Sequence, residues 1–377
     1  TQSTYIPGIL SNTNFFRLVS SSGQSCGSDS SNIVKKTLLP ALVKASIDSS
    51  QSICYNTSPN TLFRTAAASG ADGNFSYIWQ SSANGTSWSN ITGQTGTSFN
   101  PPSLTSSTYY RLLATSTFGC GAIASDSVFI EVFPQINAGS IDSSQNICFN
   151  SSPAALFFNI NPTGGGSAYS YQWQVSADSI TFNNITGAIS NSTSPSSLTA
   201  DRFYRSIVTS NFGCGNDTSN IISVNVYDPF VPASIGYSDS VCFGFAADTL
   251  SIDILPTGGN GNYSYQWLSS SNASTWTAIA GQTQSTYIPG ILSNTNFFRL
   301  ISSSGQSCGS DSSNIALSKV LPLPDTVQIL GPNTVCRNQQ FVTYYPSSLS
   351  ELYTYKWTIQ LGEFSGGEKT IPARIRW

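Results

Sequence analysis

The stretch Tyr171-Gln172-Trp173-Gln174-Val175 decides the fold class, because apolar and polar residues alternate along it with a period of two. That period is typical of a strand with one buried face. The run at residues 221–226 is rich in β-branched residues and largely alternates as well. Turn-forming residues separate such runs, as at 83–86 and 162–166. No window has helical periodicity, so the sequence predicts an all-β protein.

The same pattern returns every 94 residues. Spacings of 28 and 66 residues alternate between the eight cysteines, which are Cys26, Cys54, Cys120, Cys148, Cys214, Cys242, Cys308 and Cys336. A Tyr-x-Trp pair keeps this register at Trp79, Trp173 and Trp267, and an aromatic-aromatic-Arg triplet keeps it at Arg17, Arg111, Arg205 and Arg299. A fixed period indicates a repeat array.

Each period has the size of one β-sandwich of the immunoglobulin (Ig) type. We therefore expect part of a repeat at residues 1–42, a first repeat at 43–136, a second at 137–230, a third at 231–324, and a different domain fragment at 325–377. Residues 1–33 return as 283–315 with one difference, Val19 for Ile301. Such near-identity suggests duplication in blocks of three, and we expect this chain to be a segment of a longer array.

The regular, even set of cysteines predicts disulfides formed in an oxidising compartment. Zinc fits less well, because the chain has no Cys-x-x-Cys motif and no histidine. One pair within each repeat is the preferred assignment, which leaves Cys26 and Cys336 with partners outside the chain. The pairs would be Cys54–Cys120, Cys148–Cys214 and Cys242–Cys308. Pairing between neighbouring repeats, such as Cys120 with Cys148, is the alternative.

The composition argues against several functions. The 377 residues include 15 Lys and Arg, 18 Asp and Glu and no His, and only 9% are charged. So little basic charge does not favour nucleic-acid binding, and no apolar run is long enough to span a bilayer. Histidine, the commonest general base and metal ligand, is absent. The four glutamates do not recur as paired carboxylates with the 94-residue period. We expect neither an enzyme nor a cofactor. The chain also has no Asp-x-Asp-x-Asp loop, so its sequence does not predict a calcium site of that kind.

The first repeat resembles the Ig-like repeats of very large surface adhesins of the phylum Bacteroidota. The resemblance covers its whole length, through Ile53-Cys54, Ser58-Pro59, Tyr77-Ile78-Trp79-Gln80, Trp88-Ser89-Asn90-Ile91, Tyr109-Tyr110-Arg111 and Gly119-Cys120. The second repeat departs from the pattern at Phe182, and the third lacks the Ser-Pro pair. Residues 325–377, with Trp357, resemble a PKD-like domain.

Among such adhesins the chain is most similar to the gliding-motility class, exported by the type IX secretion system. The resemblance implies attachment at the outer membrane through other regions, and contact with extracellular surfaces, polysaccharides and motility or secretion machinery. In Bacteroidota, Asp-Ser/Thr-apolar triplets are O-glycosylated. Five candidate sites follow, although chance occurrence in a Ser-rich chain explains them as well: Ser127, Ser179, Ser240, Thr249 and Thr326.

The aromatic residues divide into two groups. We expect Trp79, Trp173, Trp267 and Trp357 to lie in the sandwich cores. The hairpin residues Trp88, Phe182 and Trp276 are candidates for exposed, ligand-binding aromatics. The arginines of the repeated triplet would stack on neighbouring rings or pair locally.

Three functions are compatible with this sequence. The array is a stalk that projects an adhesive tip, or the repeats themselves bind surfaces through many weak sites, or they assemble laterally into a filament through exposed strand edges. The stalk is preferred, because a repeat array extends in one dimension.

Overall fold

The computed structural model describes residues 4–24, 26–142, 144–236, 238–337, 339, 342–349, 355–357, 363–364 and 373–376. These residues form short strands joined by turns, with one 3-10 segment at Gly305–Ser307 and no α-helix. The predicted all-β class is therefore confirmed. None of the described helical segments is long and apolar enough to cross a membrane. The chain divides into two compact units, Thr1–Val226 and Tyr227–Trp377, which are described separately.

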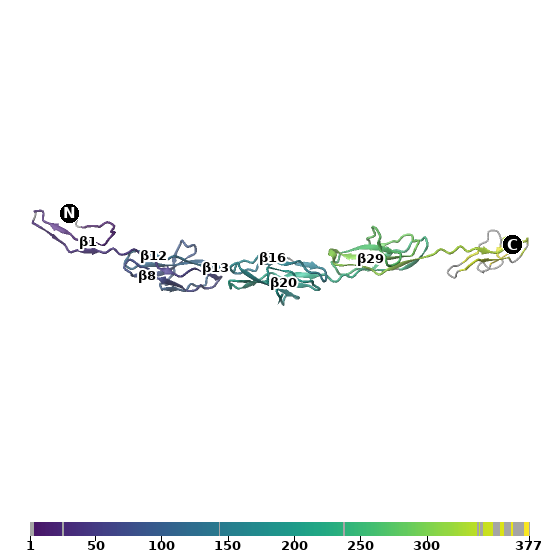
Figure 1. Ribbon diagram of the computed structural model, residues 1–377, viewed down its shortest axis with the longest axis horizontal. Helices are drawn as coiled ribbons and strands as arrows, with labels where there is room; N and C mark the ends of the chain where they lie inside the picture. The colour runs from purple at the N-terminus through teal and green to yellow at the C-terminus, as the bar shows by residue number, and fades with distance from the viewer. Residues whose placement is uncertain are drawn as a thin grey trace. The chain divides into compact units, whose positions relative to one another are not determined.

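The first repeat is a sandwich of two sheets (Figure 1). One sheet has the order β10-β7-β5, and the other has the order β6-β13-β11-β8-β9, with β12 paired to β11. The bounds are β5 (Ser46–Ile47), β6 (Gln51–Cys54), β7 (Leu62–Ala66), β8 (Phe75–Ser82), β9 (Ser89–Asn90), β10 (Ser98–Phe99), β11 (Thr108–Ser116), β12 (Ala122–Ala124) and β13 (Val128–Phe133).

The order of these strands identifies an Ig-like sandwich. The start of the repeat contributes β5 to one sheet and β6 to the other, and β6 runs parallel to the last strand, β13. The long central pair, β8 and β11, is antiparallel and sets Trp79 opposite Leu112. Ig-type sandwiches build their cores from such central strands in two facing sheets.

The second and third repeats have the same topology. The second contains β14 (Ser140–Ile141), β15 (Gln145–Ile147), β16 (Leu156–Ile160), β17 (Tyr169–Ser176), β18 (Asn183–Asn184), β19 (Ser192–Thr193), β20 (Arg202–Ser210), β21 (Asn216–Thr218) and β22 (Ile222–Val226). The third contains β23 (Ser234–Ile235), β24 (Asp239–Cys242), β25 (Leu250–Ile254), β26 (Tyr263–Ser270), β27 (Thr277–Ala278), β28 (Thr286–Tyr287), β29 (Asn296–Ser304), β30 (Ser310–Ser312) and β31 (Ala316–Leu321).

A tryptophan fills the core of each repeat. Trp79, Trp173 and Trp267 are each 0% exposed, which confirms the prediction for these three. Each indole N–H donates to a backbone carbonyl 17 residues later, as from Trp173 Nε1 to Ser190 O at 2.9 Å, so burial leaves no polar atom unpaired. Trp357 differs, because it is half-buried and lies outside any strand.

The ends of the chain are built more simply. Residues before the first repeat form two strand pairs, β1 (Asn14–Phe16) with β4 (Val34–Lys36) and β2 (Val19–Ser21) with β3 (Ser28–Ser30). After the third repeat come the four short strands β32 (Ile329–Leu330), β33 (Val342–Pro346), β34 (Glu363–Phe364) and β35 (Ala373–Arg376). The PKD-like assignment of this last part stays a prediction.

Candidate functional site: the junction between the first and second repeats

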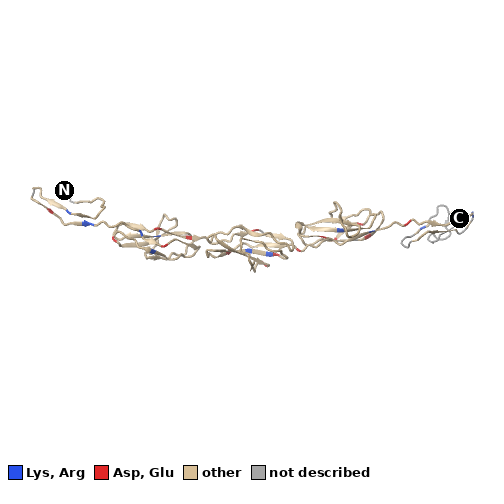
Figure 2. Cartoon of the chain, viewed as in Figure 1, with Lys and Arg blue, Asp and Glu red and all other residues tan. Residues whose placement is uncertain are grey.

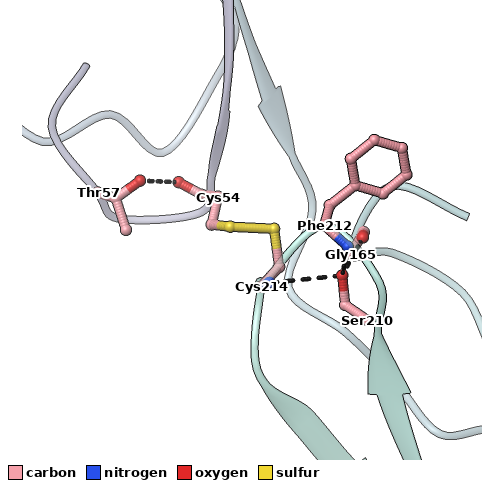
Figure 3. The surroundings of a disulfide bond; sticks show 6 residues. All are labelled: Cys54, Thr57, Gly165, Ser210, Phe212 and Cys214. Atoms are coloured by element: carbon pink, nitrogen blue, oxygen red, sulfur yellow. Dashed lines mark hydrogen bonds between the residues drawn. A yellow bond between two sulfur atoms is a disulfide. The ribbon is translucent and has the colours of Figure 1, made fainter. Parts of the chain in front are cut away.

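A disulfide joins the first repeat to the second. Cys54, the last residue of β6, is bonded to Cys214, which lies in the turn after β20 (Figure 3). The two Cα atoms are 5.2 Å apart, within the usual range for a disulfide. The bond spans 160 residues of sequence. The preferred prediction of one disulfide inside each repeat is therefore wrong.

Strand register explains why Cys54 cannot reach Cys120. Cys54 lies opposite Phe133, at the end of β13. Strand β11 runs antiparallel to β13, with its first residues opposite residues 128–130, so β11 carries the chain away from that end. Cys120 follows Ser116, at the far end of β11. Nine residues of strand span roughly 30 Å, whereas a disulfide needs Cα atoms less than about 7 Å apart.

The other six cysteines are either disulfide-bonded or free. Cys148 and Cys308 are each disulfide-bonded and, like Cys54 and Cys214, lie 160 residues apart in the sequence. In the part of the chain that the structure describes, free and exposed thiols belong to Cys26, Cys120, Cys242 and Cys336. The predicted pairs Cys148–Cys214 and Cys242–Cys308 are therefore wrong as well, and so is the alternative pair Cys120–Cys148.

The hydroxyl of Ser210 organises the turn that carries Cys214. Its Oγ donates to the carbonyl of Gly165 at 2.6 Å and accepts the backbone N–H of Phe212 at 3.1 Å and of Cys214 at 3.4 Å. Ser210 is 4% exposed, and Figure 3 shows these residues together beside the disulfide. The half-cystine is thus presented by a fixed turn at the end of β20.

The linker between the repeats is bound to the second repeat by backbone contacts. The N–H of Gly165 donates to the carbonyl of Pro134 at 2.8 Å, and Asn137 and Thr163 exchange two further bonds, each 2.9 Å long. Gly164 has φ +75°, and a side chain there would overlap the carbonyl oxygen of Gln135. Only glycine combines this conformation with so close an approach.

Aromatic packing completes the junction. The rings of Phe133, at the end of the first repeat, and Phe212, in the turn beside Cys214, lie 5.1 Å apart between centroids. A side chain on Gly166 would collide with the ring of Phe212. The carboxylate of Asp217 accepts the N–H of Ala138 at 2.8 Å, which ties the start of the second repeat to β21. Covalent, hydrogen-bonded and apolar contacts therefore act at one junction.

The sequence pattern predicts only an ordinary turn at the glycines of this junction. A usable signal existed, since Gly70, Gly164 and Gly258 recur with the 94-residue period. All three have positive φ and leave no room for a side chain, and the oxygen in the way belongs in each case to the segment preceding that repeat. A glycine at each entry point of the array therefore accepts the linker.

The hairpin aromatics Trp88, Phe182 and Trp276 are half-buried, so only part of each ring is exposed, and ligand binding at them stays a prediction. The guanidinium carbon of Arg111 lies 4.2 Å from the ring centroid of Trp88, and Arg205 and Arg299 cover Phe182 and Trp276 in the same way. These contacts confirm that the repeated arginines stack on neighbouring rings; Arg17, by contrast, is exposed. One ring face of each hairpin aromatic is therefore occupied.

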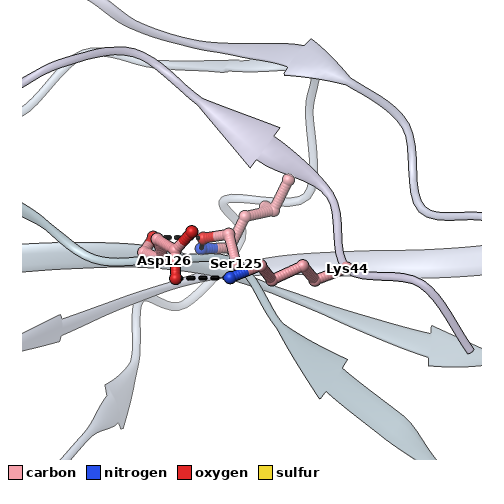
Figure 4. A network of polar contacts seen from close by, with 4 residues as sticks. Lys44, Ser125 and Asp126 are labelled. Carbon is pink, nitrogen blue, oxygen red and sulfur yellow. Dashed lines mark hydrogen bonds and ion pairs between the residues drawn. The ribbon is translucent and has the colours of Figure 1, made fainter.

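Charged side chains are sparse over the described residues (Figure 2). The structure shows one ion pair among them, between Lys44 Nζ and Asp126 Oδ1 at 2.6 Å (Figure 4). Both side chains are largely exposed, so the pair contributes little to stability. No group of three or more acidic or cysteine side chains suited to a metal occurs in the described part of the chain.

The candidate glycosylation residues are all exposed, namely Ser127, Ser179, Ser240, Thr249 and Thr326. Ser179 lies at the tip of the β17–β18 turn with φ +62°. Its neighbour Asp178 accepts the N–H groups of Thr181 and Ile180, and these bonds, aided by Ser176, lower the pKa of the Asp178 carboxyl to about 2. The hydroxyls are accessible, and modification at them stays a prediction.

Several known structures and one family are similar to this chain. Three N-terminal domains of the bacteriophage RB49 highly immunogenic outer capsid protein are 12% identical, covering 75% of this chain and 100% of theirs, with a TM-score of 0.38. Mouse cadherin-23 EC22–24 is 11% identical, covering 74% and 99%, with a TM-score of 0.37. Sidekick-1 immunoglobulin domains 1–4 are 15% identical, covering 74% and 75%, with a TM-score of 0.28.

At these values the likenesses say nothing about function, and no curated protein matches the sequence. The sequence profile of one family, by contrast, matches residues 43–134, 137–228 and 231–322, one match for each repeat. These matches cover well over half of the chain. The chain therefore belongs to the DUF8696 family, a domain of unknown function.

Proposed function

We propose that this chain is a repetitive extracellular stalk, part of a large surface adhesin, that holds adhesive regions away from the cell. The observation that carries the proposal is the junction between the first two repeats. There a disulfide, a docked linker and the packed rings of Phe133 and Phe212 act together. A flexible tether needs none of these contacts, whereas a spacer that keeps its length does.

The chemistry of the chain supports this reading. Two disulfides per chain favour an oxidising, extracellular compartment. Only 9% of the residues are charged, and the tryptophans of the three repeats are buried in their cores. The sequence resemblance to Bacteroidota repeats extends the proposal to adhesins of the gliding-motility class, exported by the type IX system, attached at the outer membrane and O-glycosylated. Other regions of such an adhesin would meet the motility machinery.

A second function is favoured by one observation. Trp88, Phe182 and Trp276 recur at the same hairpin with an arginine over one face, and a repeated aromatic platform suits weak, multivalent sugar binding. Half-burial counts against it, because less of each ring is left for a ligand. Lateral assembly through strand edges is the third candidate.

Binding of the folded, oxidised chain to polysaccharide arrays, glass and agar separates the candidates. A stalk gives no saturable binding and sediments as a monomer. Saturable binding that is lost in the triple variant Trp88→Ala, Phe182→Ala, Trp276→Ala, with folding intact by circular dichroism, would make the repeats themselves adhesive. Concentration-dependent sedimentation would instead support the filament.

A further inference from the structure

The disulfide between Cys54 and Cys214 changes how the chain can carry a pulling force. Residues 55–213 form a closed loop, because both ends of that segment meet at one covalent bond. A force applied along the chain enters the first repeat through β5 and β6 and reaches Cys54. From there the disulfide bond transmits it directly to Cys214. It leaves the second repeat through β21 and β22.

Most of the core of both repeats lies inside this loop, whereas the core residues Ala45, Ile222 and Val224 lie outside it. Trp79 with its partner strands β8 and β11, and Trp173 with β17 and β20, all fall between residues 55 and 213. In the first repeat, force reaches only residues 43–54 on the entry side. In the second, it reaches only the residues after 214. The central strands of the two hydrophobic cores therefore carry no sustained tension, whereas the strands β5, β6 and β22 at their margins do.

We infer that the inter-repeat disulfide is a tension bypass, which makes a pair of neighbouring repeats nearly inextensible even when their sheets come apart. This inference rests on the proposed stalk function for its biological meaning, but it follows from the pairing itself. A disulfide inside one repeat would protect only that repeat. A bond from one repeat to the next protects most of two repeats, together with the linker between them.

The loop has a size that an experiment can measure. An extended chain spans about 3.3–3.6 Å per residue, so the 160-residue separation corresponds to roughly 530–580 Å of contour length. That length is withheld while the bond is intact and is released when the bond is reduced. Tyr55 and the half-cystines line an open hollow at the junction, so a small reductant can reach the sulfur atoms.

Single-molecule force spectroscopy on the full chain tests the inference. The chain is held at its two ends through tags without cysteine, its free thiols are alkylated, and Cys148→Ser with Cys308→Ser leaves one disulfide. In the oxidised variant we expect one full unfolding step, from the third repeat. After reduction we expect three such steps and roughly 530–580 Å of added contour length. The wild-type chain, in which Cys148 and Cys308 are disulfide-bonded as well, should release at least as much.

A variant that also carries Cys54→Ser and Cys214→Ser is the control, and reductant should not change its extension. Non-reducing peptide mapping of the same sample must show the Cys54–Cys214 link. The inference is overturned if the oxidised protein reaches the reduced contour length while that link is present, or if mapping finds Cys54 bonded elsewhere. The outcome does not depend on ligand binding, so it can fail while the stalk proposal survives, and the reverse.

Discussion

The guanidinium of Arg299 lies over the ring of Trp276, 4.3 Å from its centroid, yet the Nε of this arginine has no hydrogen-bond partner among the described residues. In the first repeat the matching Arg111 Nε donates to Gln80 Oε1 at 2.7 Å, and Gln80 in turn donates to Asn90. The third repeat has Leu268 and Ala278 in place of this glutamine and asparagine. The arginine is retained there without its partners.

Restoring both partners should stabilise the third repeat. We expect the double variant Leu268→Gln, Ala278→Asn to gain about 1 kcal/mol, because hydrogen bonds to the otherwise unpaired, buried Nε of Arg299 and between the two new amides outweigh the lost burial of Leu268, which is 7% exposed. Leu268→Gln alone should gain less, because the new amide N–H group would lack the acceptor that Asn90 provides in the first repeat. Hydrogen exchange of peptides from β26 and β29 measures the effect within this repeat. Equal protection in wild type and double variant would contradict the expectation.

The second repeat should lose stability in acid through Asp178. Its folded-state pKa is about 2, below its ordinary value of 3.8, so the stabilisation is present above the ordinary pKa and is lost as the pH falls through that value toward 2. Asn84 and Asn272 occupy this position in the other repeats and accept the same kind of backbone bonds. Asp178→Asn should therefore remove the acid sensitivity of this turn. Hydrogen exchange of the Ile180 and Thr181 amides at pH 4 and pH 2 measures this loss of protection. An unchanged pH response in the variant would show that Asp178 is not its cause.

Gly164→Ala should loosen the junction between the first and second repeats. The new Cβ would overlap the carbonyl of Gln135, and the positive φ alone costs about 1–2 kcal/mol. Gly187→Ala is the matched control, since Gly187 has nearly the same φ, +77°, but nothing within 4 Å of the added carbon. Faster exchange at Asn137 and Gly165 is expected in the first variant and not in the second. Similar exchange in both would show that the linker is not held through this glycine.

Thiol chemistry should divide the cysteines in two equal groups. Under native, oxidising conditions a maleimide should label Cys26, Cys120, Cys242 and Cys336, and leave Cys54, Cys148, Cys214 and Cys308 unmodified. Closing the 160-residue loop is worth about 5 kcal/mol on the chain-entropy view. Reduction should therefore lower the unfolding temperature of the first two repeats. A peptide linking Cys54 to Cys120 would refute the structure at this point.

Much of the fold could be predicted from the sequence, because local residue patterns indicate the strands and their buried residues. Alternation at residues 171–175 indicated a strand, and the period of the Tyr-x-Trp pairs located the buried Trp79, Trp173 and Trp267. The alternation and the Tyr-x-Trp pair each involve residues only a few positions apart in the sequence. The partner of Cys54 depends instead on which end of the sandwich each cysteine occupies. Only the parallel pairing of β6 with β13 determines that.

Leu18 and Leu300 show that the local sequence does not determine burial either. They hold equivalent positions in a 33-residue stretch that differs at one residue, yet Leu300 is 0% exposed and Leu18 is 70% exposed. Leu300 lies in β29, opposite Trp267 of β26. The described residues around Leu18 form only short strand pairs. Burial here is decided by the sheet that a segment joins, which the segment itself does not encode.

The closed loop of residues 55–213 also bears on how the protein survives proteolysis. A protease that cuts once anywhere in that segment produces two ends, but the chain stays covalently continuous through Cys54 and Cys214. Turns such as residues 83–86 and 178–181 are exposed sites for such a cut. A nicked molecule would keep everything on the far side of the second repeat attached until the disulfide is also reduced.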